Sequence, residues 1–338
     1  MEVAVERLAL RLRAPLRTAF GTLHERELLT LRLRGRDGVE GVGEAAPLEP
    51  YDGVSPDAVR AALEDCSSLL RASDGEDREA LLAACWGAAV LPQAVAAIDL
   101  ALWDLAGRRA GKPVWALLGA AEGGSVGVNA TIGAEDRSGA AGAAAAAAAE
   151  GFACVKVKVG VGDDAGRIAA VRAATGRNVA IRIDANGAWT PDEALAHLRV
   201  LAPAELELCE ESTHGVKELR EVRDNSPVPI AMDESAALPG ALASGATDAV
   251  CLKIARCGGI SGLLDAAAIA RGARSEVYLA SSYDGPIGIA AALHAAAVVR
   301  PDRVSGLATL GAFADVDDPF APVKGRITAP SGPGLGIA

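Results

Sequence analysis

The 338-residue sequence is poor in the side chains that usually bind transition metals. Its four histidines are scattered without the spacing of a zinc site. None of its six cysteines forms a C-x-x-C pair, and three of them lie inside apolar runs, as expected for buried, reduced thiols. We therefore expect that any metal bound by this chain is held by oxygen ligands.

The sequence also lacks an excess of positive charge and long apolar segments. Its net charge is −11, and no basic patch is interleaved with aromatic residues, which make up only 3% of the chain. Such a chain would repel a phosphate backbone, so we expect no nucleic-acid partner. No segment approaches ~20 continuous strongly apolar residues, and residues 1–7 lack the layout of a secretory signal. We expect a cytoplasmic protein that does not enter a membrane.

Lysine is scarce, because only six of the 33 basic residues are Lys. Two of the six, Lys156 and Lys158, nevertheless share the apolar run 155–159, and Lys253 lies in the apolar run 251–254. Arginine stays protonated in any protein setting, whereas a buried lysine whose pKa is lowered can exchange a proton near neutral pH. These three lysines are therefore the first candidates for proton transfer.

The N-terminal third has the pattern of a small α+β unit. Residues 3–44 alternate apolar and polar side chains, with turn residues at 35–38, as in an antiparallel sheet. Helical periodicity follows over residues 56–118 and is strongest at 93–106, before the stop signal at 111–113.

Beyond Gly124 the pattern changes to short apolar runs separated by Ala-rich stretches, of which 139–149 is expected to be a helix. Eight such runs predict parallel strands with both faces covered, most commonly closed as a (β/α)8-type barrel. An open doubly wound sheet is the alternative, although no G-x-G-x-x-G follows an early strand. The predicted strands are 126–131, 154–159, 179–184, 206–210, 230–233, 249–253, 277–280 and 304–307.

Polar residues end the predicted strands, at the edge where barrel enzymes carry their active sites. The second strand carries Lys156 and Lys158 on one side, the next three end in Asp184, Glu210 and Asp233, and the sixth ends in Lys253. Three adjacent carboxylates would repel one another unless a cation lies among them, and Mg²⁺ prefers such hard oxygen ligands.

Each of these motifs alone has an ordinary structural interpretation. A K-x-K on a strand is more often a solvated face, and Asp184-Ala185-Asn186-Gly187 is more often a turn with a helix cap. The ordered series on five consecutive predicted strands is much harder to obtain from unrelated structural causes. The joint functional interpretation is therefore favoured.

With these motifs the sequence resembles the enolase superfamily, specifically its muconate-lactonising-enzyme subgroup. The resemblance also covers residues 97–107, Gly111-Lys112-Pro113, Asp233-Glu234-Ser235, Gly258-Gly259-Ile260 and Pro333-Gly334-Leu335-Gly336. It implies an α/β protein in which a modified (β/α)7β TIM-type barrel, residues 121–315, carries an N-terminal α+β capping domain. That domain would comprise residues 1–120, with the tail 316–338 packing back on it.

The resemblance also implies roles for individual residues. Asp184, Glu210 and Asp233 would bind Mg²⁺, for which Mn²⁺ could substitute, with Asn186 and Glu234 supporting these ligands. Lys158 would be the base on one face of the substrate, Lys253 would lie on the opposite face, and Lys156 would polarise the carboxylate or lower the pKa of Lys158. We further predict Ser281, Ser282 and Asp284 as substrate-binding residues, and closure of loops 18–26 and 47–54 over the substrate. One departure is Glu210-Glu211-Ser212, where many members have proline third, which makes Glu211 a weaker second ligand candidate.

The implied reaction is Mg²⁺-dependent abstraction of a proton α to a carboxylate, through an enediolate intermediate. Dehydration like that of o-succinylbenzoate synthases is the first expectation, because residues 306–310 lack the Asp-x-Asp of similar dipeptide epimerases. The alternatives are racemisation or epimerisation of dipeptides or N-acyl amino acids, a muconate cycloisomerase-like reaction, and a catalytically silent barrel that binds an acid metabolite. The expected partner is a small carboxylate substrate, and a homo-oligomer is possible.

Overall fold

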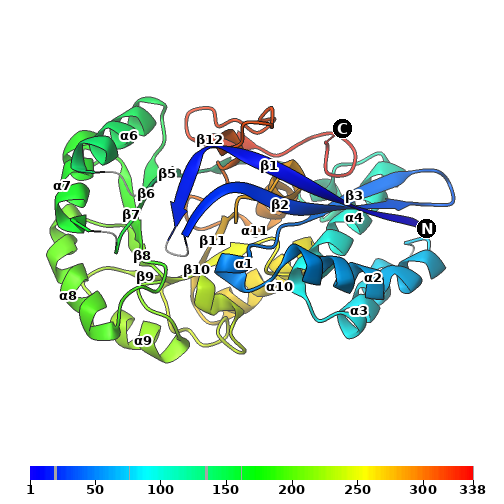
Figure 1. Ribbon diagram of the computed structural model, residues 1–338, viewed down its shortest axis with the longest axis horizontal. Coiled ribbons are helices and arrows are strands. Elements are labelled where there is room, and N and C mark those ends of the chain that lie inside the picture. Colours follow the sequence, from blue (N-terminus) through cyan, green and yellow to red (C-terminus); the bar gives the residue numbers. More distant parts are fainter. Residues whose placement is uncertain (19–20, 76, 134–135, 161, 338) are drawn as a thin grey trace.

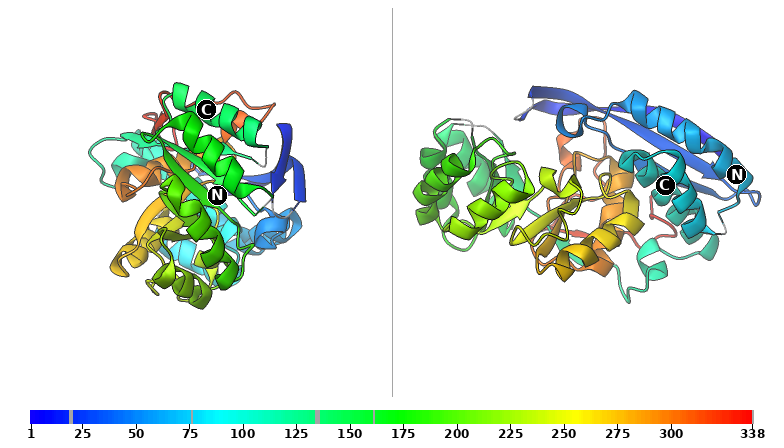
Figure 2. Two further views of the ribbon diagram at one scale, coloured as in Figure 1. Left: turned by 90° about the vertical axis from the view of Figure 1, so that its left-hand side faces the viewer. Right: turned by 90° about the horizontal axis from the view of Figure 1, so that it is seen from below.

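The computed structural model describes residues 1–18, 21–75, 77–133, 136–160 and 162–337. The chain forms an elongated molecule with an N-terminal sheet and its helices at one end and parallel βα units at the other, as Figures 1 and 2 show. The long hairpin of β1 (Glu2–Thr18) and β2 (Gly21–Arg34) spans the two parts. The predicted combination of a barrel with an N-terminal α+β unit is thus confirmed.

The N-terminal sheet is antiparallel, with β2 between β1 and β3 (Glu40–Ala45). Its buried face, including Leu29 and Leu31, packs on α4 (Pro92–Ala110). The contact is close because β3 contains Gly43, where an added Cβ would lie 1.9 Å from the carbonyl oxygen of Ala97. The other helices of this part are α1 (Glu49–Asp52), α2 (Pro56–Ala72), α3 (Arg78–Ala88) and α5 (Val114–Leu117). No helix among the described residues combines the length and apolarity needed to cross a bilayer.

Seven parallel strands form the second sheet, in the order β5 to β11. They are β5 (Ala130–Ile132), β6 (Cys154–Lys158), β7 (Ala180–Asp184), β8 (Leu208–Glu210), β9 (Ile230–Met232), β10 (Ala249–Lys253) and β11 (Glu276–Ala280). The helices between and after them are α6 (Arg137–Ala149), α7 (Asp164–Thr175), α8 (Pro191–Leu201), α9 (Val216–Asn225), α10 (Gly259–Gly272) and α11 (Pro286–Val299). The Ala-rich stretch is therefore helical, as predicted.

Two of the eight predicted strands differ from the structure. The run 126–131 is divided, because β4 (Ser125–Gly127) pairs with β12 (Arg326–Thr328) while β5 pairs with β6. The run 304–307 forms no ladder and contributes isolated bridges, from Ser305 to Val128 and from Gly306 to Ala280. These bridges join the two edges of the seven-stranded sheet, so the segment takes the eighth position around the cylinder.

Between β9 and β10 the described chain has only a short 3-10 helix, η2 (Glu234–Ala237), in place of a full α-helix. At the C-terminus, the Gly334 carbonyl accepts a hydrogen bond from the backbone of Val114, and Leu335 N–H donates to the Asp104 carboxylate of α4. The tail thus packs on the helices of the N-terminal part.

A buried charged cluster joins the N-terminal sheet to the barrel. Gly285, the N-cap of α11, donates its N–H to Glu44 Oε1 of β3 at 2.7 Å. Arg26 of β2 donates to the carbonyl of Ser282, and burial followed by the charge of Asp284 raises the pKa of Glu44 to about 8. The folded state of the protein is therefore most stable when the Glu44 carboxyl is protonated.

We expect Glu44→Gln to stabilise the protein relative to wild type as the pH rises. The pKa of Glu44 is about 8 in the fold against an ordinary 4.5, so ionisation between these values costs wild-type stability, whereas glutamine cannot ionise. Denaturant unfolding at intervals across this range should show the variant's advantage growing with pH and levelling above about 8. Glu40→Gln, at a partly exposed position of the same strand, is the control. A pH-independent difference for Glu44→Gln would contradict the expectation.

Candidate active site

The side chains that end the barrel strands converge on one pocket of about 160 Å³, which is also lined by residues of the N-terminal part. Of the residues predicted from the sequence, the pocket is lined by Lys156, Lys158, Lys253, Asp184, Asp233, Asn186, Ser281 and Ser282. Glu210 lies fully buried beside them, hydrogen bonded to Lys156. The structure therefore brings the K-x-K pair, the carboxylates and Lys253 together.

Strand register explains the contacts of the two lysines on β6. Lys158 pairs with Asp184 on β7, which in turn pairs with Glu210 on β8, so these residues lie at one level of the barrel. Lys158 Nζ lies 2.6 Å from Asp184 Oδ2 and 2.7 Å from Asn186 Oδ1. Lys156 Nζ bridges Asp184 Oδ2 at 2.9 Å and Glu210 Oε1 at 2.6 Å.

Lys253 lies on the other side of the pocket. Its Nζ is 2.6 Å from Asp233 Oδ2 and 2.6 Å from the hydroxyl of Tyr51, which belongs to α1. The strand order places β10 four positions from β6 in a cylinder of eight positions, so Lys253 and Lys158 face each other across it.

The carboxylates raise the pKa of Lys156 and Lys253, which is the opposite of the lowering expected from burial. Burial by itself lowers the pKa of Lys156, but the charges of Asp184 and Glu210 raise it well above its ordinary value. Burial likewise lowers the pKa of Lys253, and Asp233 raises it by more. The prediction that burial brings the lysines toward neutral pKa is wrong for Lys156 and Lys253 in this structure, because neighbouring negative charge outweighs desolvation.

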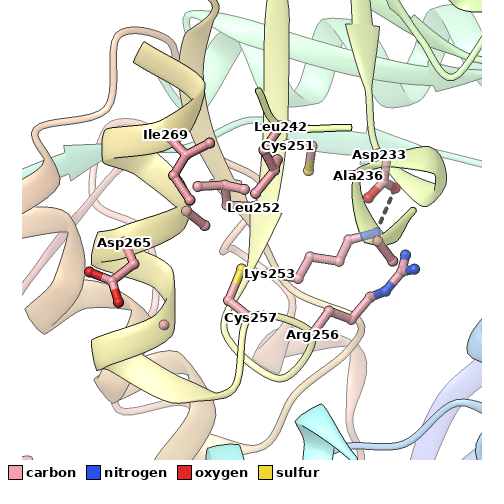
Figure 3. A pocket seen from close by; sticks show the side chains of 13 residues that line it. Asp233, Ala236, Leu242, Cys251, Leu252, Lys253, Arg256, Cys257, Asp265 and Ile269 are labelled. Atoms are coloured by element: carbon pink, nitrogen blue, oxygen red, sulfur yellow. Dashed lines mark hydrogen bonds and ion pairs between the residues drawn. The ribbon is translucent and has the colours of Figure 1, made fainter. Parts of the chain in front are cut away.

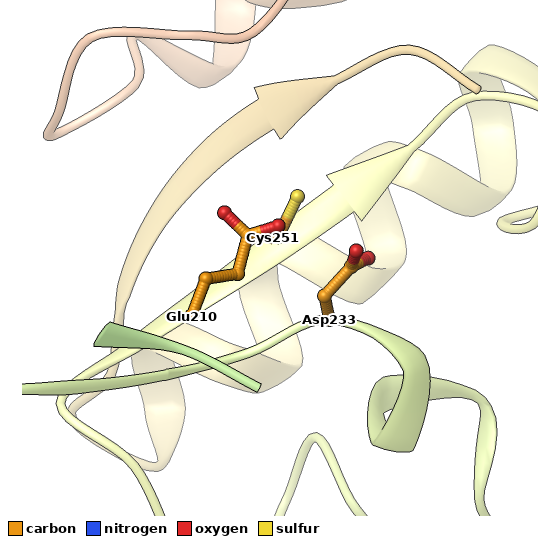
Figure 4. Close-up of side chains that lie close together, drawn as sticks. All are labelled: Glu210, Asp233 and Cys251. Carbon is orange, nitrogen blue, oxygen red and sulfur yellow. The ribbon is translucent and has the colours of Figure 1, made fainter. Parts of the chain in front are cut away.

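The carboxylate cluster fits a hard divalent cation. Asp184, Glu210 and Asp233 are each at most 3% exposed, and ammonium groups of the lysines lie among their oxygens. Burial raises the pKa of Glu210, although the charge of Lys156 beside it acts in the opposite direction. Oxygens of Glu210 and Asp233 also lie within 4.8 Å of each other and of Cys251 Sγ. Figure 4 shows these three side chains close together. A cation held by these oxygens would offset the repulsion between them.

Glu211, the weaker ligand candidate, is occupied in holding the backbone. It accepts hydrogen bonds from the N–H groups of Asp233 and Ser235 and from Ser235 Oγ. Glu234 Oε1 accepts from the Asn186 amide at 2.9 Å, so Glu234 and Asn186 form a pair beside the lysine and metal candidates.

The predicted substrate-binding residues divide into two groups. Ser281 and Ser282 line the pocket, whereas Asp284 is 1% exposed and does not line it, although the charge of Arg26 acts on its carboxylate. Sequence reasoning missed two residues that line the pocket. Asn129 has a buried Oδ1 with no hydrogen-bond partner among the described residues, and the Thr309 hydroxyl lies 2.9 Å from Ser281 Oγ. An isolated Asn or Thr carries no sequence signal that would have identified it.

Of the two segments expected to close over the substrate as loops, 47–54 contributes Leu48, Pro50 and Tyr51 to the pocket lining. The other, 18–26, is not a loop over its described residues, because Thr18 ends β1 and residues 21–26 belong to β2, from which Leu23 lines the pocket. Residues 19 and 20 of segment 18–26 lie outside the described residues.

A second cavity of about 300 Å³ adjoins the site between β10, η2 and α10. Its lining shares Asp233 and Lys253 with the active-site pocket and extends to Ile269 on α10. Figure 3 shows the ion pair of Lys253 with Asp233 and the Arg256 side chain beside it. The second cavity therefore lies directly against the active-site pocket, with the Lys253–Asp233 ion pair in the lining of both.

Fold and pocket together define a capped barrel enzyme with facing lysines and clustered carboxylates. Residues 1–119 match the mandelate racemase / muconate lactonizing enzyme N-terminal domain, and residues 140–338 match the enolase C-terminal domain-like family. The L-Ala-D/L-Glu epimerase of Bacillus subtilis (strain 168) is 30% identical, covering 100% of this chain and 96% of that protein.

Solved structures give the same result. The dipeptide epimerase from Enterococcus faecalis V583, complexed with Mg and the dipeptide L-Leu-L-Tyr, matches with a TM-score of 0.90 and 26% identity over 99% of this chain and 98% of that one. The muconate lactonizing enzyme from Pseudomonas fluorescens, complexed with muconolactone, matches with a TM-score of 0.92 and 26% identity over 100% and 95%. The chain belongs to the enolase superfamily, in its muconate-lactonising-enzyme subgroup, and is an enzyme of that superfamily. The resemblance predicted from the sequence is thus confirmed.

Proposed function

We propose that the protein abstracts a proton α to a carboxylate in a Mg²⁺-dependent reaction, and that it racemises or epimerises an amino-acid derivative. The observation that carries this proposal is the placement of Lys158 and Lys253 on strands four positions apart, lining one pocket. Two amines that face each other can remove a proton from one face of a carbon and return one to the other. Inversion of configuration is the result.

Asp184, Glu210 and Asp233 would hold the Mg²⁺ ion in this proposal. When bound, the ion would stabilise the negative charge that develops on the substrate carboxylate as the α-proton leaves. Relatives support this choice, because the Enterococcus faecalis epimerase structure contains Mg together with a dipeptide.

The side chains of this chain account for the proton movements. Neutral Lys158 takes the α-proton at Nζ, and Asp184 and Asn186 stabilise the ammonium that forms, since both accept hydrogen bonds from it. Protonated Lys253 donates a proton to the opposite face of the same carbon, and the reverse direction exchanges the two roles. Lys156, held by Glu210 and Asp184, provides a fixed positive charge near the substrate carboxylate.

The names of the relatives favour this reaction over the dehydration expected first from residues 306–310, because they include the epimerase from Bacillus subtilis. Dehydration of the o-succinylbenzoate precursor stays a prediction and belongs in the same assay.

The proposal is tested by incubating the protein with Mg²⁺ in D2O and a panel of L-dipeptides and N-succinyl amino acids, with the o-succinylbenzoate precursor beside them. Deuterium at Cα together with inverted configuration, seen by NMR and chiral chromatography, is the expected result. The same protein after chelation of divalent ions is the control and should show neither. Binding of these acids without exchange would instead support the silent barrel, and dehydrated product would replace racemisation by elimination.

A further inference from the structure

Tyr51 lies where the N-terminal part meets the barrel lysine Lys253. It sits on the four-residue helix α1, which follows β3, and its side chain lines the active-site pocket. The neighbouring Asp52 fixes this turn, since its carboxylate accepts hydrogen bonds from the backbone of Leu48 and Val54 and from the Gln93 amide of α4 at 2.8 Å. Tyr51 is therefore presented from an anchored turn.

The Tyr51 hydroxyl contacts three charged groups of the barrel. It accepts hydrogen bonds from Lys253 Nζ at 2.6 Å and Arg256 Nη1 at 2.8 Å, and it donates to Asp233 Oδ1 at 3.0 Å. Lys253 Nζ also lies 4.3 Å from the centroid of the tyrosine ring. A phenol has one proton and two acceptor sites, so these contacts use its full hydrogen-bonding capacity. The hydroxyl thus holds barrel groups in place and has no free donor for a substrate.

The facing lysine has different supports. Lys158 Nζ is held by Asp184 and Asn186, both from the β7 end of the barrel. One proton-transfer group is thus positioned within the barrel, and the other is held partly by a side chain from the N-terminal part.

We propose that Tyr51 is a positioning residue for Lys253, so that the N-terminal part sets the geometry of one of the two proton-transfer groups. This inference rests on the proposed racemase or epimerase function. Loss of the hydroxyl should therefore affect proton transfer at one face of the substrate and leave the other face nearly unchanged.

Tyr51→Phe tests this, because it removes the hydroxyl and keeps the ring. Solvent exchange of the α-proton without inversion is measured from each enantiomer in D2O with Mg²⁺. For the enantiomer whose proton faces Lys253, exchange should fall about tenfold, as expected for one lost hydrogen bond to a charged group. For the other enantiomer, the exchange rate should change less than twofold. Inversion should slow from both enantiomers, because Lys253 takes part in each direction of the reaction.

Tyr283→Phe is the matched control, since Tyr283 lines the same pocket and should alter both enantiomers alike. Lys253→Ala gives the reference value for complete loss of α-proton exchange on the substrate face next to Lys253. Equal losses from the two enantiomers in Tyr51→Phe, or no loss, would overturn the positioning role.

A measurement without substrate separates this inference from the proposed function. Reductive methylation followed by peptide mass spectrometry gives the labelling ratio of Lys253 to Lys158. The ratio should rise severalfold in Tyr51→Phe, because Lys253 Nζ loses a partner, and an unchanged ratio overturns the inference. If wild-type protein exchanges no substrate, the proposed function fails and this ratio still decides the role of Tyr51.

Discussion

Replacing Lys158 by alanine is expected to abolish α-proton exchange from the enantiomer whose proton faces β6. The base is removed from that face, and a positioned general base contributes about 10²- to 10⁴-fold to rate. The substitution also removes the ammonium that pairs with Asp184 and Asn186, but Lys156 remains beside Asp184, so the carboxylate keeps a counter-charge. Exchange measured by NMR in D2O, with the melting temperature as a test of folding, gives the result.

The control is Lys217→Ala, which replaces an exposed lysine on α9. This variant should exchange the α-proton of both enantiomers at the wild-type rate. Exchange from the opposite enantiomer should survive in Lys158→Ala, because Lys253 serves that face. If Lys158→Ala exchanged both enantiomers as wild type does, the assignment of Lys158 as base would be wrong.

Substitution of Asp184 by asparagine is expected to remove Mg²⁺ binding. Asp184 is buried, and its carboxylate lies between two lysines, whose charges oppose burial and hold its pKa below the ordinary value. A metal that binds only the folded state, at a free concentration of a hundred times its Kd, stabilises the wild-type protein against unfolding by about 2.7 kcal/mol. Asp184→Asn should lose this gain, as measured by unfolding with and without Mg²⁺ and by calorimetric titration.

Glu234→Gln is the control that distinguishes a metal ligand from a neighbouring carboxylate. Glu234 contacts Asn186 and is expected to support the ligands without binding the ion itself, so this variant should keep most of the Mg²⁺-dependent stabilisation. Complete loss of Mg²⁺ binding in Glu234→Gln, or unchanged binding in Asp184→Asn, would contradict the ligand set. Comparing each variant with itself, with and without metal, cancels the change in stability that the substitution itself causes.

The candidate active-site residues at the ends of the barrel strands could be predicted because the sequence around each of them is sufficient to identify it. Lys156 and Lys158 share a strand face by spacing alone, and Asp184, Glu210 and Asp233 each follow a short apolar run. Parallel order then brings these ends to one edge without any knowledge of long-range contacts. The candidate site could be predicted from the sequence for this reason.

The features that were missed depend on contacts between distant segments. The run 126–131 divides because β12, about 200 residues later, pairs with its first half. Tyr51 reaches Lys253 across 202 positions, and no local pattern encodes that approach. The raised pKa of Lys253 depends on the neighbouring βα unit, since the largest charge that opposes its burial is that of Asp233, which directly follows β9.

The pocket is lined by two groups of residues from different parts of the chain, which affects how the protein can change during evolution. The lysines and carboxylates come from β6 to β10, whereas Leu23, Leu48 and Thr309 come from the cap and the segment after the last full strand. Mutations in the second group can alter the pocket's shape while the inherited charges are retained. A lineage can thus acquire a new substrate without first losing its chemistry. Tyr51 is a point where the two groups touch, so sequence change in the N-terminal part reaches Lys253, a proposed proton-transfer residue, through this hydrogen bond.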